Sequence, residues 1–282
     1  TFNEPMVYFY EGYLTRRWPP AKGGIGSGLK AVRTMLRAHA QAYRYIHGLQ
    51  PDAQVGIAHN MRLFDPANPR SLFDRLIAGL EDRVFNQVAL WALIDGCLRL
   101  PLGFGRYLPE LDDSLDFIGL NYYTRDMVSF APRGATAFMA RNFARPGAIT
   151  DAFGWELYPE GLYRLLMRLA SYGKPIYVTE HGLADNTDEL RPAYIVRTIT
   201  HMWRAINEGT PVRGYFHWTL LDNFEWAEGY DVRFGLVSVD RDTMRRTVKK
   251  SGEVYRQICL ANGLTLDLIR DYAPEIATEG MG

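Results

Sequence analysis

The segment KPIYVTEHGLADNTDELRPAYIVRTITHMWRAINEGTPVRGYFHW (174–218) contains the unit that decides the predicted fold. KPIYVTE (174–180) is a nearly continuous apolar run, which predicts a strand buried on both faces, and VRGYFHW (212–218) predicts a second strand. PAYIVRTITHMWRAINEG (192–209) lies between them and predicts a helix that ends at Gly209. Two buried strands joined by a helix indicate a parallel sheet covered by helices.

Strand and helix patterns alternate in the same way over most of the chain. The other predicted elements are a strand stub ending in TFNEP (1–5), a helix from Ser27 to Gly48, a strand at 54–60, a helix at 71–94, a strand at 115–123, a helix at 159–172, a hairpin near 234–248 and a helix at about 250–262. Residues from about 125 to 154 show no clean periodicity and predict a long surface loop.

Polar and aromatic residues collect where the predicted strands end, at Asn60, at 121–123, at Glu180 and at Trp218. Both a (β/α)8 barrel and an open doubly wound sheet bind ligands at that end of their strands. No Gly-rich phosphate loop follows any strand, which favours the barrel. A (β/α)8 TIM barrel has eight strands, whereas four strands and a stub are predicted here. Residues 1–282 are therefore predicted to form a single catalytic domain of the α/β class. It would supply roughly strands 4 to 8 of such a barrel, with the N-terminal strands absent.

Composition narrows the range of partners. The chain has 32 basic and 32 acidic side chains and no long run of one sign, which argues against nucleic acid and against a membrane anchor and favours a neutral substrate. Cys97 and Cys259 are too few for a disulfide framework and predict buried free thiols. No apolar run reaches the roughly 20 residues of a membrane span, and no signal peptide is recognised, so a cytoplasmic location is expected.

Three segments carry the candidate chemistry: TFNEP (1–5), YVTEHG (177–182) and FHWTLLDNFEWAEGY (216–230). The first two place Glu4 and Glu180 on the rim of one predicted barrel. Paired carboxylates suit glycoside hydrolysis, in which one acts as acid and then base while the other attacks the anomeric carbon. The alternative is that each glutamate is an ion-pair partner at a strand end. Burial of Glu4 and repulsion between the two are expected to separate their pKa values and leave Glu180 ionised.

These motifs resemble those of glycoside hydrolase family 1, the β-glucosidase and β-galactosidase family, along essentially the whole chain. TFNEP matches the acid/base motif T-x-N-E-P, and TEHG (179–182) matches the nucleophile motif T-E-N-G except at His181. NYYT (121–124) resembles the segment whose second tyrosine, here Tyr123, hydrogen-bonds the nucleophile. The loop at 216–230 resembles the clamp for the nonreducing sugar, and RFGLVSVD (233–240) and KKSGEVY (249–255) continue the pattern.

The resemblance implies Glu4 as acid/base, Glu180 as nucleophile and no cofactor or metal. Side-chain chemistry agrees with the implied sugar contacts: Asn3 can donate to the 2-hydroxyl, Glu225 can accept from hydroxyls 4 and 6, Trp226 can donate through its indole, and Trp218 offers a flat floor. Trp155 either lines the aglycone side or plugs the core. Asn121 either supports the site or satisfies backbone groups. His39, His47 and His59 lack metal-ligand spacing.

The implied activity is that of a retaining β-glycosidase acting on terminal nonreducing β-D-glucosyl residues, with galactosyl and fucosyl residues as further candidates. An acidic Glu225 would repel a 6-phosphate, so an unphosphorylated sugar is favoured. In the family, the earlier strands supply a glutamine, a His–Trp pair and an arginine near the nucleophile. The expected partners are therefore a small or oligosaccharide β-glycoside and the missing N-terminal half of the barrel, covalent or copurifying. The alternative function is a noncatalytic fragment that binds sugar weakly.

Overall fold

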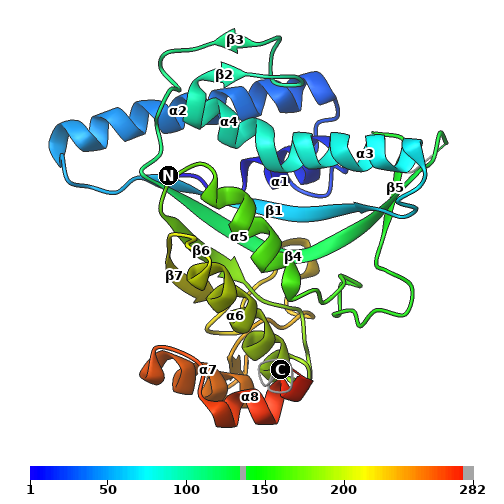
Figure 1. Cartoon of the computed structure of the whole chain (residues 1–282), viewed down its shortest axis with the longest axis vertical. Coiled ribbons are helices and arrows are strands. Elements are labelled where there is room, and N and C mark those ends of the chain that lie inside the picture. Colours follow the sequence, from blue (N-terminus) through cyan, green and yellow to red (C-terminus); the bar gives the residue numbers. More distant parts are fainter. Residues whose placement is uncertain (134–137, 276–282) are drawn as a thin grey trace.

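The computed structural model describes residues 1–133 and 138–275. Its centre is a parallel sheet of β1 (Gly56–Pro66), β4 (Phe117–Phe130), β6 (Ile176–His181) and β7 (Val212–His217), in that spatial order. Asn3 adds a parallel bridge to Ala58 on the outer side of β1. The sheet thus has the four strands and the stub that the sequence predicts, in chain order, as in consecutive strands of a barrel (Figure 1).

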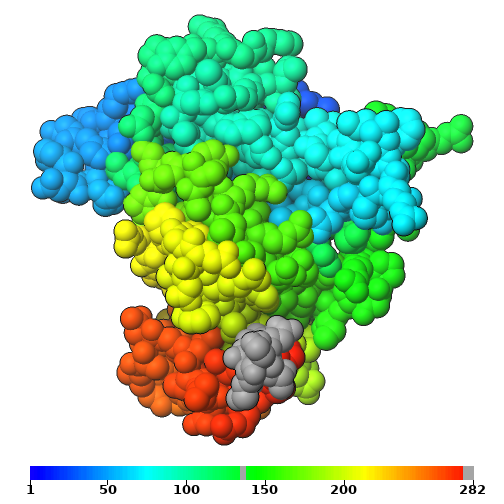
Figure 2. Space-filling view, viewed as in Figure 1, coloured from blue at the N-terminus to red at the C-terminus, as the bar shows by residue number. Residues whose placement is uncertain are grey.

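Helices follow the strands and cover one face of the sheet (Figure 1). They are α1 (Pro5–Phe9), α2 (Ile25–Leu49), α3 (Leu72–Asp82), α4 (Val88–Asp95), α5 (Glu160–Ala170), α6 (Arg191–Asn207), α7 (Lys250–Ala261) and α8 (Leu266–Tyr272), with π-helical turns η1 (Tyr10–Leu14) and η2 (Arg83–Gln87) and a 3-10 turn η3 (Trp226–Glu228). Short strand pairs β2 (Cys97–Leu98) with β3 (Arg106–Tyr107), and β8 (Val237–Val239) with β9 (Arg246–Val248), lie outside the main sheet. The first half of the chain, blue to green, lies toward one end of the molecule, and the orange-red C-terminal helices lie at the other (Figure 2).

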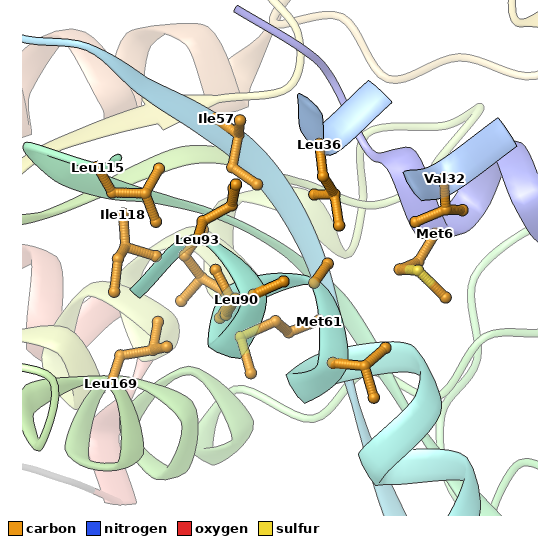
Figure 3. Close-up of a cluster of buried hydrophobic side chains, with 14 of the residues drawn as sticks. Met6, Val32, Leu36, Ile57, Met61, Leu90, Leu93, Leu115, Ile118 and Leu169 are labelled. Atoms are coloured by element: carbon orange, nitrogen blue, oxygen red, sulfur yellow. The ribbon is translucent and has the colours of Figure 1, made fainter. Parts of the chain in front are cut away.

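The main core lies between the sheet and its helices. Figure 3 shows Leu36 of α2, Ile57 and Met61 of β1, and Leu90 and Leu93 of α4 in this layer, all at most 2% exposed. Burial of each such side chain contributes roughly 1.5–3 kcal/mol. Because side chains alternate along a strand, packing of Met61 against the helices turns its neighbours Asn60 and Arg62 to the other side of β1.

The sequence misplaced several boundaries. Ser27 and Gly48 lie inside α2, which begins after Gly24 and ends at Leu49. The predicted surface loop at 125–154 is in part regular structure: β4 runs on to Phe130, and β5 (Ala140–Phe143) pairs with it antiparallel. The part of that prediction at 134–137 lies outside the described residues. The strand signal was lost because this stretch of β4 extends beyond its pairing with β6, which ends at Tyr122, and carries polar residues such as Asp126.

The cysteine prediction fails in part, and the sheet is open. Cys259 is exposed and Cys97 is half-buried, so Cys259 is not the buried thiol that its apolar context predicts. Within residues 1–133 and 138–275, no strand pairs with the outer edge of β7, whose Phe216 is 58% exposed. No helix in the described part of the chain has the length and apolarity needed to cross a membrane.

Candidate active site

Glu4 is held at the edge of the sheet by the strand stub. Its backbone N–H donates to the Ala58 carbonyl at 2.8 Å, and its backbone adopts the left-handed conformation (φ 49°, ψ 58°) just before α1 begins at Pro5. The side chain then meets two strand ends, because Glu4 Oε1 accepts from Asn60 Nδ2 at 2.9 Å and from Asn121 Nδ2 at 2.8 Å. The carboxylate of Glu4, near residue 1, is thereby positioned by side chains from β1 and β4.

Asn121 connects the three neighbouring segments. Its Nδ2 also lies 3.2 Å from Asn3 Oδ1, and its Oδ1 accepts from Thr179 Oγ1 of β6 at 2.6 Å. The side chain is fully buried and does not line the cavity described below. Of the two roles that the sequence left open, this geometry favours support of the site over contact with a substrate.

Glu180 occupies the end of β6, beside Tyr123 of β4. The Tyr123 hydroxyl donates to Glu180 Oε2 at 2.6 Å. Tyr194 of α6 donates through its own hydroxyl to the Tyr123 carbonyl at 3.2 Å, which ties this part of β4 to the helix behind it. The contact between Tyr123 and the second carboxylate that the family motif implies is therefore present.

Burial and mutual repulsion govern the ionisation of the two carboxylates. Burial raises the pKa of Glu4, and the amides of Asn121 and Asn60 and the charge of Arg62 oppose that rise only in part. Burial, and then the charge of Glu4, raise the pKa of Glu180 to about 7, while the Tyr123 hydrogen bond acts in the opposite direction. Desolvation therefore raises the pKa of both carboxyl groups, and the charge of Glu4 adds to the rise at Glu180.

The loop after β7 supplies the third predicted segment. Burial raises the pKa of Glu225, and the neighbouring Trp218 side chain opposes that rise. Glu225 Oε2 is buried and has no partner among the described residues. Trp226 lies at the rim, 59% exposed, and stacks on Trp18 with ring centroids 5.0 Å apart. The buried, unpartnered oxygen of Glu225 is therefore an acceptor available to a hydroxyl group.

One cavity of about 380 Å³ joins these groups. It is lined by eight of the nine predicted site residues: Asn3, Glu4, Tyr123, Trp155, Glu180, Trp218, Glu225 and Trp226. Among the further lining residues that the sequence missed are the polar side chains of Tyr10, Arg62, Glu81, Asp126 and Asn142. Arg62 and Asp126 lie two and three residues beyond the predicted strand ends at 60 and 123, so their nearness to those ends was the signal that could have found them.

The structural alternative for the two glutamates does not fit their surroundings. Between the residues that the structure describes, neither Glu4 nor Glu180 forms an ion pair with a lysine or arginine. The same part of the chain contains no group of three or more His, Cys, Asp or Glu side chains arranged to hold a metal ion. Two half-buried carboxylates that repel each other and face a cavity are an arrangement typical of acid–base and nucleophilic chemistry.

Comparison with known proteins gives a consistent result. The model of glycosyl hydrolase family 1 matches residues 1–92 and 106–264. The chain is 36% identical to beta-glucosidase A of Thermotoga maritima, over 94% of this chain and 63% of that protein. It is also 36% identical to a beta-galactosidase of Sulfolobus acidocaldarius, over 95% of this chain and 55% of that protein. It thus spans less than two thirds of the length of these relatives.

Solved structures agree with the sequence comparison. A beta-glycosidase from Pyrococcus horikoshii superposes with a TM-score of 0.86 at 37% identity, covering 96% of this chain and 63% of that one. The beta-glucosidase from Thermotoga maritima in complex with glucoimidazole superposes with a TM-score of 0.86 at 35% identity, covering 94% and 64%. These neighbours are barrel enzymes, so the sheet described here corresponds to part of a (β/α)8 barrel.

Proposed function

Because the chain belongs to glycosyl hydrolase family 1, we propose that it carries the catalytic groups of a retaining β-glycosidase, with Glu4 as acid/base and Glu180 as nucleophile. The observation that carries this proposal is the single cavity that both carboxylates line, where each is desolvated and neither is neutralised by a cation among the described residues. Their separation in sequence means that the fold itself brings them together.

The reaction proceeds in two displacements. Ionised Glu180 attacks the anomeric carbon while protonated Glu4 transfers its proton to the departing glycosidic oxygen, so that one C–O bond forms as the other breaks. A water molecule then loses a proton to Glu4 and attacks the same carbon, which releases the sugar with its original configuration and regenerates both carboxyl groups. Each cycle therefore starts with one proton bound to the pair of carboxyl groups, on Glu4.

The sugar that we propose is an unphosphorylated β-D-glucosyl residue, with galactosyl and fucosyl residues as further candidates. Glu225 supports this choice, since its buried, unpartnered Oε2 suits a sugar hydroxyl and its charge would repel a phosphate. Asn3 and Trp226 add a neutral amide and an indole donor at the cavity. The relatives include both beta-glucosidases and beta-galactosidases, and Thermotoga maritima structures hold glucoimidazole and deoxynojirimycin.

We further propose that strands outside this chain close the barrel, either on a longer polypeptide or on a copurifying one. Support comes from the open edge of β7, the exposed Phe216 (58%) and Leu220 (65%) beside it, and the 63% of beta-glucosidase A that the chain spans. The alternative is a noncatalytic fragment with weak sugar binding. A cytoplasmic location stays a prediction.

The test uses the protein that carries this chain and an aryl β-glucoside. Intact mass is measured first, because a species heavier than 32.2 kDa or a second polypeptide supports barrel closure. Glu180→Gly should then abolish hydrolysis, at a cost of many powers of ten, and added azide should yield an α-linked adduct. If Glu180→Gly kept activity within about tenfold of the parent, Glu180 would not be the nucleophile. Glu253→Gly, which alters an exposed pair with Arg256, is the control that should leave the rate unchanged.

A further inference from the structure

A second cavity lies outside the active site, between helix α2 and the segment that carries β2 and β3. It has a volume of about 540 Å³ and shares no lining residue with the cavity that contains Glu4 and Glu180. β2 and β3 belong to the connection between α4 and the start of β4, and Figure 1 shows them at the end of the molecule away from α7 and α8. They therefore lie toward the N-terminal ends of the strands, which in a barrel is the side opposite the catalytic rim.

Positively charged side chains form one stripe along α2 and face this second cavity. Lys30, Arg33 and Arg37 line it together with Thr34, and their spacing of three and four residues places them on the same face of the helix. Arg106 of β3 adds a fourth positive charge, and the lining within the described residues contains no acid. Like charges at this spacing destabilise a helix. In a chain of zero net charge, such a local excess favours the binding of an anion.

Only part of this charge is neutralised by the protein itself. Arg37 Nη2 pairs with Glu110 Oε1 at 3.0 Å, and Arg106 is near enough to Glu110 to act on it electrostatically. Within residues 1–133 and 138–275, the side chains of Lys30 and Arg106 form no hydrogen bond and no ion pair. Their N–H donors are therefore available to an added anion.

The loop between β2 and β3 is fixed against α2. Arg33 Nη1 donates to the Leu102 carbonyl at 3.0 Å, and the Gly105 backbone N–H donates to the Leu98 carbonyl at 3.0 Å. Gly105 has a φ of 78°, which glycine adopts without steric cost. This turn leaves Phe104 94% exposed, although the side chain lines the cavity. The loop thus presents a nearly bare aromatic ring beside the cations.

The rest of the lining is apolar. Leu98, Leu102 and Leu108 line the cavity and are part of the buried core. An inorganic anion would use the cations and leave this wall and Phe104 without a partner. A nonpolar molecule would leave the positive charges uncompensated. The ligand that suits both parts of the lining is an organic anion with a compact charged group and an apolar or aromatic body.

Phosphate is the charged group that suits these cations. Planar guanidinium groups bind phosphate through paired hydrogen bonds, and a phosphate monoester carries close to two negative charges at neutral pH. A single carboxylate would balance a smaller share of four positive charges. The volume of about 540 Å³ falls within the range of small-molecule pockets, roughly 300–1,000 Å³. A stable protein partner would instead cover about 800 Å² of surface, more than one helix stripe and one loop present.

The loop is not part of what the chain shares with its family. The family model matches residues 1–92 and 106–264, so residues 93–105 fall outside the match. This segment contributes Leu98, Leu102, Gly103 and Phe104 to the cavity. The catalytic chemistry of the family therefore assigns no role to the second cavity.

We propose that the cavity between α2 and the β2–β3 segment binds a small phosphate monoester with an aromatic or apolar body. The phosphate contacts the cationic stripe, and the body packs on Phe104 and the leucine wall. The cationic side chains are Lys30, Arg33, Arg37 and Arg106. This site goes beyond the proposed glycosidase function and does not depend on it.

The test measures the binding of phenyl phosphate to the protein that carries this chain, by isothermal titration calorimetry. Arg106→Gln and Lys30→Gln should each raise its Kd by about 10-fold, as for loss of a hydrogen bond to a charged group. Phe104→Ala should raise the Kd of phenyl phosphate by about 2-fold to 10-fold and leave that of inorganic phosphate unchanged, because only the former has a ring. Arg75→Gln is the matched control, since Arg75 is exposed on α3 outside both cavities.

Controls distinguish this site from other ways of binding the probe. The Tm of each variant without ligand should match that of the parent, and phenyl phosphate should raise the Tm of the parent more than that of Arg106→Gln. Arg62→Gln, which removes a cation from the active-site cavity, should leave the Kd unchanged. The proposal is overturned by a lack of binding at millimolar phenyl phosphate, by equal binding of uncharged phenol, or by losses in Arg62→Gln or Arg75→Gln that match those in Arg106→Gln. Binding of an acidic peptide without binding of phenyl phosphate would also overturn it, in favour of a protein partner.

Discussion

The hydrogen bond from Tyr123 to Glu180 makes a sharp prediction about pH dependence. The phenol donates to Glu180 Oε2 at 2.6 Å, and this contact opposes the rise that burial and Glu4 impose on the pKa of Glu180, which lies at about 7. Tyr123→Phe removes the donor and leaves the ring that packs against Trp155 and Phe234. The ionised form of Glu180, the proposed nucleophile, is then less stable, and a larger share of the protein holds Glu180 protonated and unable to attack.

The size of the effect follows from the energy of that bond. A hydrogen bond to a charged group contributes about 1.5–3 kcal/mol, and about 1.4 kcal/mol corresponds to one pH unit. Since the bond stabilises the ionised form, its loss should move the acidic limb of kcat/KM upward by about one to two pH units. At a pH below the acidic limbs of both proteins, kcat/KM of the variant should be about 10-fold to 100-fold lower than that of the parent. The difference should narrow as the pH rises.

The measurement is a profile of kcat/KM against pH for nitrophenyl β-glucoside. Tyr122→Phe is the matched control: its hydroxyl is buried and donates at 2.6 Å, but to the Tyr158 carbonyl and not to a carboxylate. This control should leave the limb where it is. An unmoved limb in Tyr123→Phe, or an equal movement in both variants, would show that the bond does not set the ionisation of Glu180.

Three further predictions concern Glu4, Glu225 and Asp151. Glu4→Gln should slow substrates with poor leaving groups far more than activated aryl glycosides, because only the former need its proton, and equal losses would indicate a structural role. Glu225→Ser should weaken glucoside hydrolysis and ease the penalty on 6-phosphoglucosides; a parent that already prefers the phosphorylated substrate would contradict this. Asp151 accepts the N–H groups of Phe153 and Trp155, and burial raises its pKa from 3.8 to about 6, so the native state retains a proton that the unfolded state releases. The contribution of Asp151 to the free energy of unfolding therefore falls as pH rises from about 4 to 6. The free energy of urea unfolding of the parent, relative to that of Asp151→Asn, should be about 3 kcal/mol lower at pH 7 than at pH 4.

The fold was predictable because its signals are local. The apolar runs at 174–180 and 212–218 need burial on both faces, and the amphipathic stretch between them needs a sheet to cover, so order and direction of the strands followed from the sequence. Boundaries were less predictable. The outer part of β4, which extends to Phe130, pairs with β5. The residues of these two paired segments show no periodic apolar pattern in the sequence, so the pairing was not predicted.

The site was predictable where a motif carried it and unpredictable where contacts join distant residues. Glu4, Glu180 and Tyr123 stand in recognisable segments. Glu81 lies on a helix and Asn142 on a strand 61 residues away, and only the packing of α3 beside β4 and β5 brings them to the cavity. Neither residue has a neighbour in sequence that indicates its place in the cavity wall, so finding it required the structure.

The hydrogen bonds also favour one distribution of the proton shared by the carboxylates. Both amides that reach Glu4, from Asn60 and Asn121, donate to Oε1, and Oε2 has no partner among the described residues. A protonated carboxyl group accepts on one oxygen and donates from the other, so Oε2 is the oxygen of Glu4 that can hold a proton for a leaving group. Glu180 instead receives the Tyr123 hydroxyl, a contact that stabilises its ionised form. Because two charges in one cavity repel, the first proton belongs on Glu4 Oε2 and leaves Glu180 ionised, as the proposed roles of the two residues require.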